Sequence, residues 1–176
     1  MQSVMNLKIK FRESFRPFAP SVLEESAADY FEMREHEQSP YMLLVAPVRA
    51  SHRIDVDTQL QAVRGFDKLK VQRSHIPAVT HVDYSARVQT VDADRHRRYY
   101  KLISKFRDKT GCPLLINTSF NVRGEPIVGS PADAYRCFMA TDIDALVIED
   151  FVLRKDEQPV PRKSARADYV ESFSLD

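Results

Sequence analysis

Residues 113–126 read Pro-Leu-Leu-Ile-Asn-Thr-Ser-Phe-Asn-Val-Arg-Gly-Glu-Pro and combine an apolar segment with a polar one. The apolar start, Pro113 to Ile116, predicts a short buried strand. A polar loop follows at the carboxyl end of that strand, where ligands gather in α/β sheets. Such side chains can orient a ribose, a phosphate or an acyl group, whereas in ordinary turns they only satisfy their own backbone. The loop carries more of them than one turn requires: Asn117, Thr118, Ser119 and Asn121.

Helices are predicted on both sides of this strand. Asp94 to Lys109 has apolar residues at helical spacing and is followed by Gly111, a common residue just beyond a helix end. Ser130 and Pro131 are typical of an N-cap and first helical position, which predicts a helix to about Ala140. Two closing strands are expected at Ala145–Ile148 and Phe151–Leu153.

The N-terminal half predicts further strands and one more helix. Residues 7–12 alternate apolar and basic, which predicts a half-buried strand with Lys10 and Arg12 on one face and Arg16 just beyond. Ser21 and Glu24 form a capping-box pattern that predicts a helix over 22–34. Strands are expected within 41–48 and, as a hairpin turning at 83–85, within 76–91. The polar segment 49–75, with a weak helical pattern at 57–64, is expected to be mobile.

Strands and helices therefore alternate along the chain, which indicates an α/β (α+β) fold with a mixed sheet and helical cover. A coiled coil, a helical bundle and a β-sandwich fit this pattern poorly.

The composition is that of one soluble domain of 176 residues and 20.3 kDa. Lys and Arg number 26 against 25 Asp and Glu, so the net charge does not favour a nucleic-acid partner. No apolar run is long enough to span a membrane, and the start lacks the apolar core of a signal peptide. Cys112 and Cys137 lack metal-ligand spacing and are expected to be reduced in a cytoplasmic protein.

Several charged residues are candidates for chemistry. Lys10, Arg12 and Arg16 can hold phosphate or carbonate oxygens, or they can protect an edge strand from aggregation. His81 and Asp83 are a weak metal or acid/base signal, and a hydrogen-bonded structural pair is favoured. Arg87 either completes a triphosphate clamp or pairs with a surface carboxylate.

Known catalytic and phosphate-binding loops are absent from the sequence. Neither GxGxxG nor GxxxxGK[ST] occurs, so a bound nucleotide would be held by side chains. G-x-S-x-G is also absent, so a hydrolase serine is not expected.

Together, these segments resemble the C-terminal region of the NodU/CmcH-type O-carbamoyltransferases over about residues 6–154. The similar strings are Asn6-x-x-Ile-Lys-x-Arg-Glu-x-Phe-Arg-Pro-Phe-Ala-Pro-Ser-Val22, Ser39-Pro-Tyr-Met42, Ile76-Pro-Ala-Val-Thr-His-Val-Asp83, Ala86-Arg-Val-Gln-Thr-Val91 and Gly111-Cys-Pro-Leu-Leu-Ile-Asn-Thr-Ser-Phe-Asn-Val-Arg-Gly-Glu-Pro-Ile-Val128.

The resemblance implies a YrdC-like twisted mixed open sheet with helices covering it, over residues 1–154, and a flexible tail over 155–176. It implies binding of carbamoyl phosphate and of ATP with Mg²⁺ as substrate, formation of carbamoyl adenylate, and no metal site of its own. Transfer to a hydroxyl acceptor would need a metal-binding N-terminal domain or subunit, and the chain resembles the second half only. A homodimer is a further expectation, and a non-catalytic partner-docking module is the alternative function.

The resemblance also implies roles for residues of this chain. The family pairs a K-x-R with an S-x-N, which Lys10-Phe-Arg12 and Ser119-Phe-Asn121 match. Lys10, Arg16 and Arg87 would hold phosphate and carbamoyl oxygens as the catalytic residues, and Arg12 would support them. The nucleotide or substrate would be bound by Arg12, Asn117, Thr118, Ser119 and Asn121. One departure is Tyr84, which stands where the family usually has Gly, so the turn before Arg87 must tolerate a bulky side chain.

Overall fold

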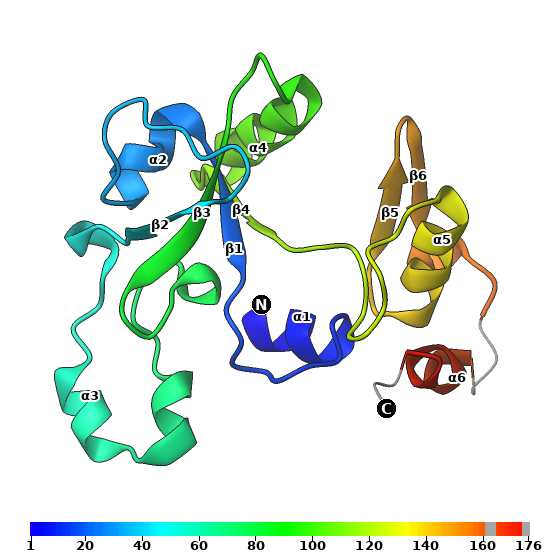
Figure 1. Cartoon of the computed structure of the whole chain (residues 1–176), viewed down its shortest axis with the longest axis horizontal. Helices are drawn as coiled ribbons and strands as arrows, with labels where there is room; N and C mark the ends of the chain where they lie inside the picture. The colour runs from blue at the N-terminus through cyan, green and yellow to red at the C-terminus, as the bar shows by residue number, and fades with distance from the viewer. Residues whose placement is uncertain (161–164, 174–176) are drawn as a thin grey trace. The chain divides into compact units, whose positions relative to one another are not determined.

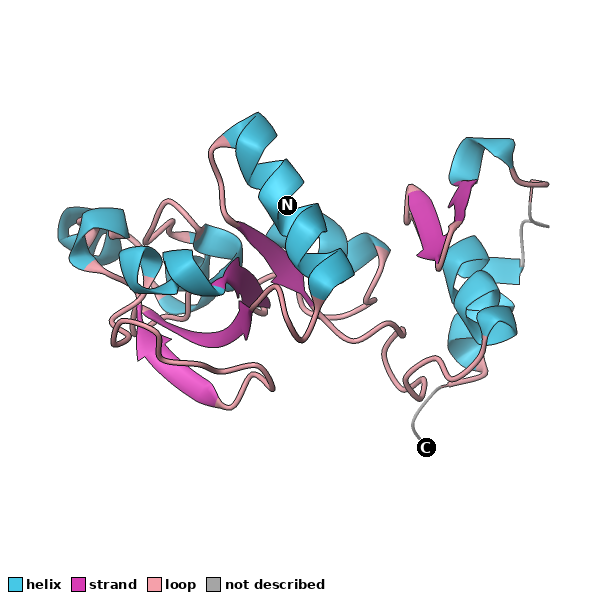
Figure 2. Cartoon of the chain, turned by 90° about the horizontal axis from the view of Figure 1, so that it is seen from above, coloured by secondary structure: helices cyan, strands magenta, loops and turns pink. Residues whose placement is uncertain are grey.

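The structure, a computed structural model, describes residues 1–160 and 165–173. The chain forms two compact units, one from Met1–Arg16 with the described residues from Ser119 on, and one from Pro17–Thr118. Each unit contains both helices and strands (Figure 2). The expected α/β (α+β) fold class is therefore confirmed.

The unit of residues 17–118 is built on a mixed sheet with the strand order β2-β3-β1-β4 (Figure 1). β1 pairs with β3 in parallel and with β4 antiparallel, and β2 pairs with β3 antiparallel. In chain order its elements are β1 (Ala19–Leu23), α2 (Glu24–Tyr30), β2 (Leu44–Pro47), η1 (Ala50–His52), α3 (Asp57–Ala62), η2 (Gly65–Lys70), η3 (Pro77–Val79), β3 (Ser85–Val91), α4 (Arg97–Thr110) and β4 (Leu114–Asn117).

β1 lies at the centre of this unit, and all five of its residues are buried. Because side chains alternate along a strand, neighbouring residues of β1 face opposite sides of the sheet. Val22 belongs to a cluster with Phe31, just after α2, whereas Leu23 packs with Ile103 of α4. The central strand is thus covered on both faces, one cluster on each side.

The expected helix over 22–34 is wrong in its first part. Ser21 lies inside β1 opposite Gln89, and its hydroxyl donates to Gln89 Oε1 at 2.5 Å instead of capping a helix. α2 begins only at Glu24 and ends at Tyr30, so the last part of the expected range, 31–34, is not helical either. Pro20 has a strand partner only in β4, because the pairing with β3 begins at Ser21, and this position lets the sheet accept a residue without an N–H.

The expected hairpin over 76–91 is also wrong, although its turn is present. β3 pairs with β1 and β2, and the preceding residues form η3 instead of a strand. Tyr84 has a left-handed φ of +63°, a conformation that glycine adopts freely. The turn therefore accepts the bulky residue at a strained backbone position.

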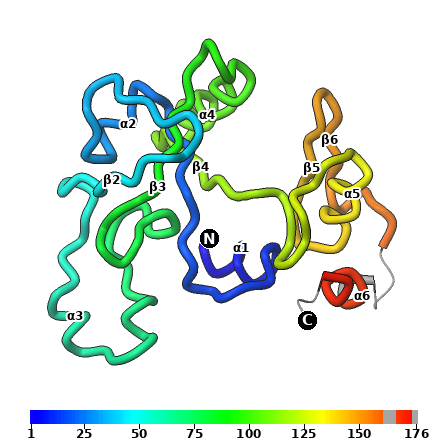
Figure 3. Tube along the Cα trace, in the orientation of Figure 1, coloured from blue at the N-terminus to red at the C-terminus, as the bar shows by residue number. Residues whose placement is uncertain are grey.

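Between β2 and β3 the chain makes a long excursion that includes α3 (Figure 3). This helix confirms the weak helical pattern expected at 57–64, while the mobility of 49–75 stays a prediction. β2 confirms the strand expected within 41–48 but is shorter than that range.

The other unit combines one hairpin with helices. Its elements are α1 (Gln2–Lys8), α5 (Pro131–Ala140), β5 (Ala145–Ile148), β6 (Phe151–Arg154), η4 (Lys155–Glu157) and α6 (Ala165–Glu171). Phe138 of α5 packs with Leu146 of β5. The Ser130 side chain accepts a hydrogen bond from the Asp133 backbone N–H at 3.2 Å, which confirms the expected N-cap.

The strand expected over residues 7–12 is wrong. α1 runs to Lys8, Leu7 is exposed, and Phe11 has a φ of +49°. Lys10 and Arg12 therefore do not share a strand face. An alternation over only six residues is a weak signal, and hydrogen bonds from Asn6 to the following turn decide the path of the chain here.

The segment expected to be a flexible tail, 155–176, contains η4 and α6. Of this segment, residues 161–164 and 174–176 lie outside the described residues, and flexibility of the tail stays a prediction. None of the described helices is long and apolar enough to cross a bilayer.

Gly111 ends α4 with a φ of +77°, and its N–H bonds the Arg107 carbonyl oxygen. We expect Gly111→Ala to lower the free energy of unfolding by about 1 kcal/mol, because a Cβ disfavours the left-handed conformation. A Cβ at this position meets nothing within 4 Å, so the backbone alone is tested. Urea denaturation followed by circular dichroism measures the loss. Gly111→Asn is the matched control and should lose less, and equal stability of the Ala variant and the wild type would contradict the interpretation.

Candidate functional site

The side chain of Lys10 is the centre of the candidate site. It is 4% exposed, and its Nζ lies 2.9 Å from the Ser119 carbonyl oxygen. Nζ also lies 2.6 Å from both the carbonyl oxygen and Oδ1 of Asn121, and 3.4 Å from Ser119 Oγ. The structure thus brings the K-x-R and S-x-N segments together, although they are more than 100 residues apart in sequence.

The ammonium of Lys10 uses its donors inside the protein. A lysine ammonium has three N–H groups, and three oxygens lie within 3 Å of Nζ. Burial, and next the positive charge of Arg12, lower the pKa of Lys10 to about 8, while Cys137 and Glu125 act in the opposite direction. Lys10 is therefore mostly charged at neutral pH and loses its charge about one pH unit above it.

Asn121 connects Lys10 to the rest of the polar loop. Its Oδ1 accepts from Lys10 and, at 2.7 Å, from the Ser119 hydroxyl. Its Nδ2 donates to the Glu125 carbonyl oxygen at 2.7 Å. Each atom of the amide group thus has a partner that fits it, so the orientation of the side chain is fixed by its contacts.

Arg12 is held by a buried asparagine. Its Nε donates to Asn6 Oδ1 at 2.6 Å, and Asn6 Nδ2 donates to the carbonyl oxygens of Ser14 (3.2 Å) and Arg16 (2.8 Å). Asn6 has no exposed surface. Burial, and next the charge of Arg16, lower the pKa of Arg12. The turn that follows α1 is therefore organised around the Asn6 side chain.

A further cation joins this cluster. Glu13 lies between Arg16 (3.9 Å) and Arg123 (3.7 Å), and the Arg123 backbone N–H bonds the Lys10 carbonyl oxygen at 3.2 Å. The guanidinium groups of Arg16 and Arg123 are both exposed. The site thus combines one buried cation with exposed guanidinium groups that can meet an anion.

Three predicted site residues belong to the unit of residues 17–118. Asn117 Nδ2 donates at 2.7 Å to Gln89 Oε1, which also accepts from Ser21, so this amide links β4, β3 and β1. Thr118 is half-buried, and Arg87 is exposed on β3 opposite Val45. Their roles stay predictions.

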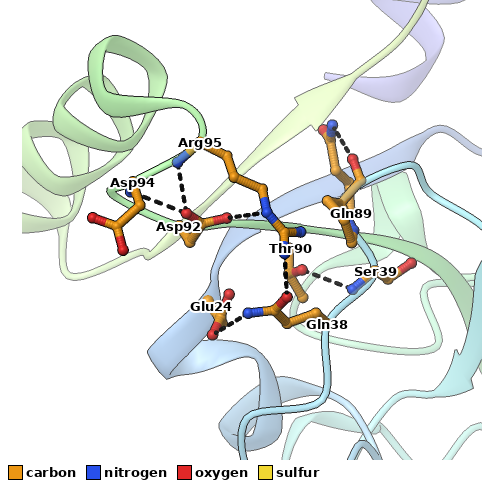
Figure 4. A network of polar contacts seen from close by, with 9 residues as sticks. Glu24, Gln38, Ser39, Gln89, Thr90, Asp92, Asp94 and Arg95 are labelled. Carbon is orange, nitrogen blue, oxygen red and sulfur yellow. Dashed lines mark hydrogen bonds and ion pairs between the residues drawn. The ribbon is translucent and has the colours of Figure 1, made fainter.

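Gln89 belongs to a polar network along β3 (Figure 4). Next to it, Thr90 Oγ1 accepts from the Ser39 backbone N–H at 2.8 Å. Asp92 then accepts from the backbone N–H groups of Asp94 and Arg95. These bonds hold the chain around β3 and the start of the connection to α4.

The His81 and Asp83 side chains meet through Ser85. The Ser85 hydroxyl donates to Asp83 Oδ1 at 2.7 Å and lies 2.9 Å from His81 Nδ1. This bond, and next the one from the Ser85 backbone N–H, lower the pKa of Asp83. The favoured interpretation, a hydrogen-bonded structural pair, holds in the form of a serine-bridged turn. Across residues 1–160 and 165–173, no three His, Cys, Asp or Glu side chains are placed to hold a metal ion.

Four residues of the site escaped the sequence reasoning as contributors. Each of them is buried or lies outside the predicted K-x-R and S-x-N segments, and none has a local sequence pattern that indicates its partner. These residues are Asn6, Arg123, Glu125 and Tyr169. Asn6, Arg123 and Glu125 do stand within the strings that carry the family resemblance, and this was the signal available.

Comparison with known protein families shows to which family this chain belongs. The family model described as carbamoyltransferase C-terminus matches residues 1–155. The chain belongs to the carbamoyltransferase C-terminal family. The resemblance seen in its motifs is therefore confirmed.

Curated relatives of this carbamoyltransferase C-terminal chain include nodulation proteins. It is 43% identical over 152 residues to Nodulation protein NolNO of Sinorhizobium fredii, covering 86% of this chain and 19% of that protein. Nodulation protein NolO of Bradyrhizobium diazoefficiens is 40% identical over 152 residues, covering 86% and 24%. Uncharacterized protein sll1178 of Synechocystis is 55% identical over all 176 residues, which are 28% of that protein. The chain thus spans between a fifth and somewhat more than a quarter of these relatives.

We expect Asn6→Ala to lower the free energy of unfolding of this carbamoyltransferase C-terminal chain by about 2–3 kcal/mol. The change removes three side-chain hydrogen bonds and leaves buried polar partners unsatisfied. Gln2→Ala, in the same helix, removes one exposed bond to the Phe15 carbonyl oxygen and is the control, with a loss below about 1 kcal/mol. Thermal unfolding by circular dichroism compares the two, and equal losses would contradict the special role of Asn6.

Proposed function

We propose that this chain is the C-terminal part of an O-carbamoyltransferase that binds ATP and carbamoyl phosphate and forms carbamoyl adenylate. A separate N-terminal domain or subunit, which holds a metal, would pass the carbamoyl group to a hydroxyl acceptor. A cytoplasmic location is part of this proposal. Family membership supports transferase chemistry, and the observation that carries the finer proposal is the buried Lys10 ammonium held by the S-x-N loop.

The charges around Lys10 support an anionic ligand. Within residues 1–160 and 165–173, the contacts place Glu13 and Glu125 beside Lys10, Arg16 and Arg123, so these cations outnumber the two carboxylates. Exposed guanidinium groups can bind phosphate oxygens through two parallel N–H bonds. A phosphate-bearing substrate would relieve the mutual repulsion of these cations.

Lys10 is expected to act mainly by preorganisation. Because its donors are already used by Ser119 and Asn121, direct contact with a substrate requires it to exchange one protein oxygen for a substrate oxygen. Without exchange, its charge still stabilises the negative charge of a nearby phosphate, and its bonds fix the loop. The exposed guanidinium of Arg16 does not have to give up buried hydrogen bonds to reach a substrate, so Arg16 is the better candidate for direct contact.

The reaction is balanced when one water is consumed. Carbamoyl phosphate and ATP then give carbamoyl adenylate, inorganic phosphate and pyrophosphate. The phosphate comes from carbamoyl phosphate, and the pyrophosphate leaves from the β- and γ-positions of ATP as the carbamate oxygen bonds to the α-phosphorus. Charge accumulates on phosphate oxygens throughout, so positioning and electrostatic stabilisation suffice without a side-chain nucleophile.

The direct test mixes the purified chain with MgATP and carbamoyl phosphate and measures pyrophosphate and inorganic phosphate. We expect release of both only when both substrates are present, and a loss of at least about 100-fold in Lys10→Gln, Arg16→Ala and Arg87→Ala, as is usual for electrostatic groups in catalysis. Lys8→Gln, an exposed lysine at the end of α1, is the matched control and should retain activity.

Calorimetry separates the outcomes of this test. Absence of ATP binding at millimolar concentration would overturn the proposal. Binding without pyrophosphate release, together with tight association with an N-terminal carbamoyltransferase domain, would instead favour a docking module.

The affinity for carbamoyl phosphate should fall as pH rises through 8. Lys10 has a pKa of about 8, so its charged fraction drops from about nine-tenths at pH 7 to about one-tenth at pH 9. If the ammonium form binds the anion, the association constant falls by up to about tenfold over this interval. Titration calorimetry at pH 7, 8 and 9 measures the fall. Lys10→Arg keeps its charge and should flatten the profile, and the same slope in both proteins would contradict the assignment.

A further inference from the structure

The C-terminal helix α6 contacts the loop that holds Lys10, although it lies beyond the residues that match the family. The link is Glu125, a carboxylate that is only 8% exposed. A buried carboxylate is costly unless donors satisfy its oxygens. Glu125 Oε2 accepts from the Val122 backbone N–H at 2.8 Å, and Oε1 accepts from the Tyr169 hydroxyl. One donor thus comes from the loop itself and one from α6, and the Cys137 thiol of α5 also bonds this carboxylate.

The backbone of Glu125 is connected to Lys10 through Asn121. Asn121 Nδ2 donates to the Glu125 carbonyl oxygen, and Asn121 Oδ1 accepts from Lys10 Nζ. Tyr169 thus bonds the side chain of Glu125, while the backbone of the same residue bonds Asn121, which in turn accepts from Lys10. A change at Tyr169 alters how firmly Lys10 is held.

A second contact between the C-terminal segment and the loop is independent of the first. Gly124 has a φ of +81°, and a Cβ at this position would overlap the Phe173 carbonyl oxygen. The rings of Phe173 and Tyr169 meet edge to face, with centroids 5.1 Å apart. The segment thus approaches the loop so closely that a side chain larger than glycine does not fit there.

Tyr169 and Cys137, beside Glu125, keep their protons and can donate hydrogen bonds. Burial, and next the bond to Glu125, raise the pKa of Tyr169 above its usual value. Burial, and next the charge of Glu125, raise the pKa of Cys137 to about 12. Neither group adds a second negative charge beside the carboxylate at physiological pH.

We propose that Tyr169 is a positioning residue, and that α6 is a latch that holds the S-x-N loop and thereby Lys10 in the geometry that binds the substrate anion. The Tyr169 hydroxyl satisfies one oxygen of the Glu125 carboxylate, whose other oxygen accepts from the Val122 N–H, and the backbone of Glu125 accepts from Asn121. This proposal deepens the proposed function and rests on it, since the latch serves the Lys10 site.

Tyr169→Phe tests the latch in the full chain, because it removes one hydroxyl and retains the ring. Tyr135→Phe is the matched control, since it removes a hydroxyl that bonds Gln158 at 3.2 Å in the same unit. Hydrogen exchange of the Val122 N–H should be about tenfold faster in Tyr169→Phe and unchanged in Tyr135→Phe, as expected for loss of one hydrogen bond to a charged group. The pH midpoint of the Lys10 ammonium, followed by NMR, should move upward in Tyr169→Phe as water reaches the loosened loop.

Activity provides a further readout. If the wild type releases pyrophosphate, Tyr169→Phe should raise KM for carbamoyl phosphate about tenfold with a smaller effect on kcat, because binding geometry is lost before chemistry. Gly124→Ala should reproduce these effects by displacing Phe173, whereas Gly111→Ala, which also places a Cβ at a positive φ but meets nothing within 4 Å, should not.

The outcomes separate the latch from the proposed function. Unchanged Val122 exchange and an unchanged Lys10 midpoint in Tyr169→Phe would overturn the latch, whatever the activity. A wild type that neither binds ATP nor releases pyrophosphate would overturn the proposed function, while the exchange and the NMR titration would still decide whether α6 holds the loop.

Discussion

The burial of one ammonium group is the constraint on which the site depends. An unpaired buried cation would cost several kcal/mol, so the chain must bring oxygens to Lys10 Nζ. Ser119 and Asn121 supply them through two backbone carbonyl groups and one side-chain oxygen within 3 Å. The loop must therefore turn its carbonyl groups inward at 119–121. This requirement, more than any ligand, fixes the shape of the stretch that the sequence marks as polar.

The same constraint divides the polar residues of the site into two groups. Asn6, Asn121 and Glu125 make hydrogen bonds to other parts of the protein and so shape the site, while substrate binding by Asn121 stays a prediction. Arg16 and Arg123 are exposed, and among the described residues they pair with Glu13 at nearly 4 Å. Such long, exposed ion pairs contribute little to stability, so a phosphate group can replace Glu13 as their partner at low cost. The outer cations are thus the ones suited to exchange.

The C-terminal half of the fold could be predicted from the sequence because its signals are local. The Ser130 cap, the left-handed Gly111 and the apolar runs of β4, β5 and β6 each act within a few residues. The N-terminal half could not, because distant partners decide it. Ser21 and Glu24 look like a capping box, but Ser21 enters the central strand, where pairing with β3 and β4 buries it completely. Burial between two layers of helix outweighs a cap worth about 1 kcal/mol.

The site shows the same division. The pairing of Lys10 with Ser119 and Asn121 was reached through family motifs, and the contact itself depends on a fold that no local pattern encodes. Tyr169 has no such motif, because it acts on Glu125 and only through it on the loop. A residue that is three contacts away from the ammonium cannot be recognised from motif spacing or composition. It becomes visible only when the oxygens of Glu125 are followed to their donors, and this is why the outer support of a charged site is the part least accessible from sequence.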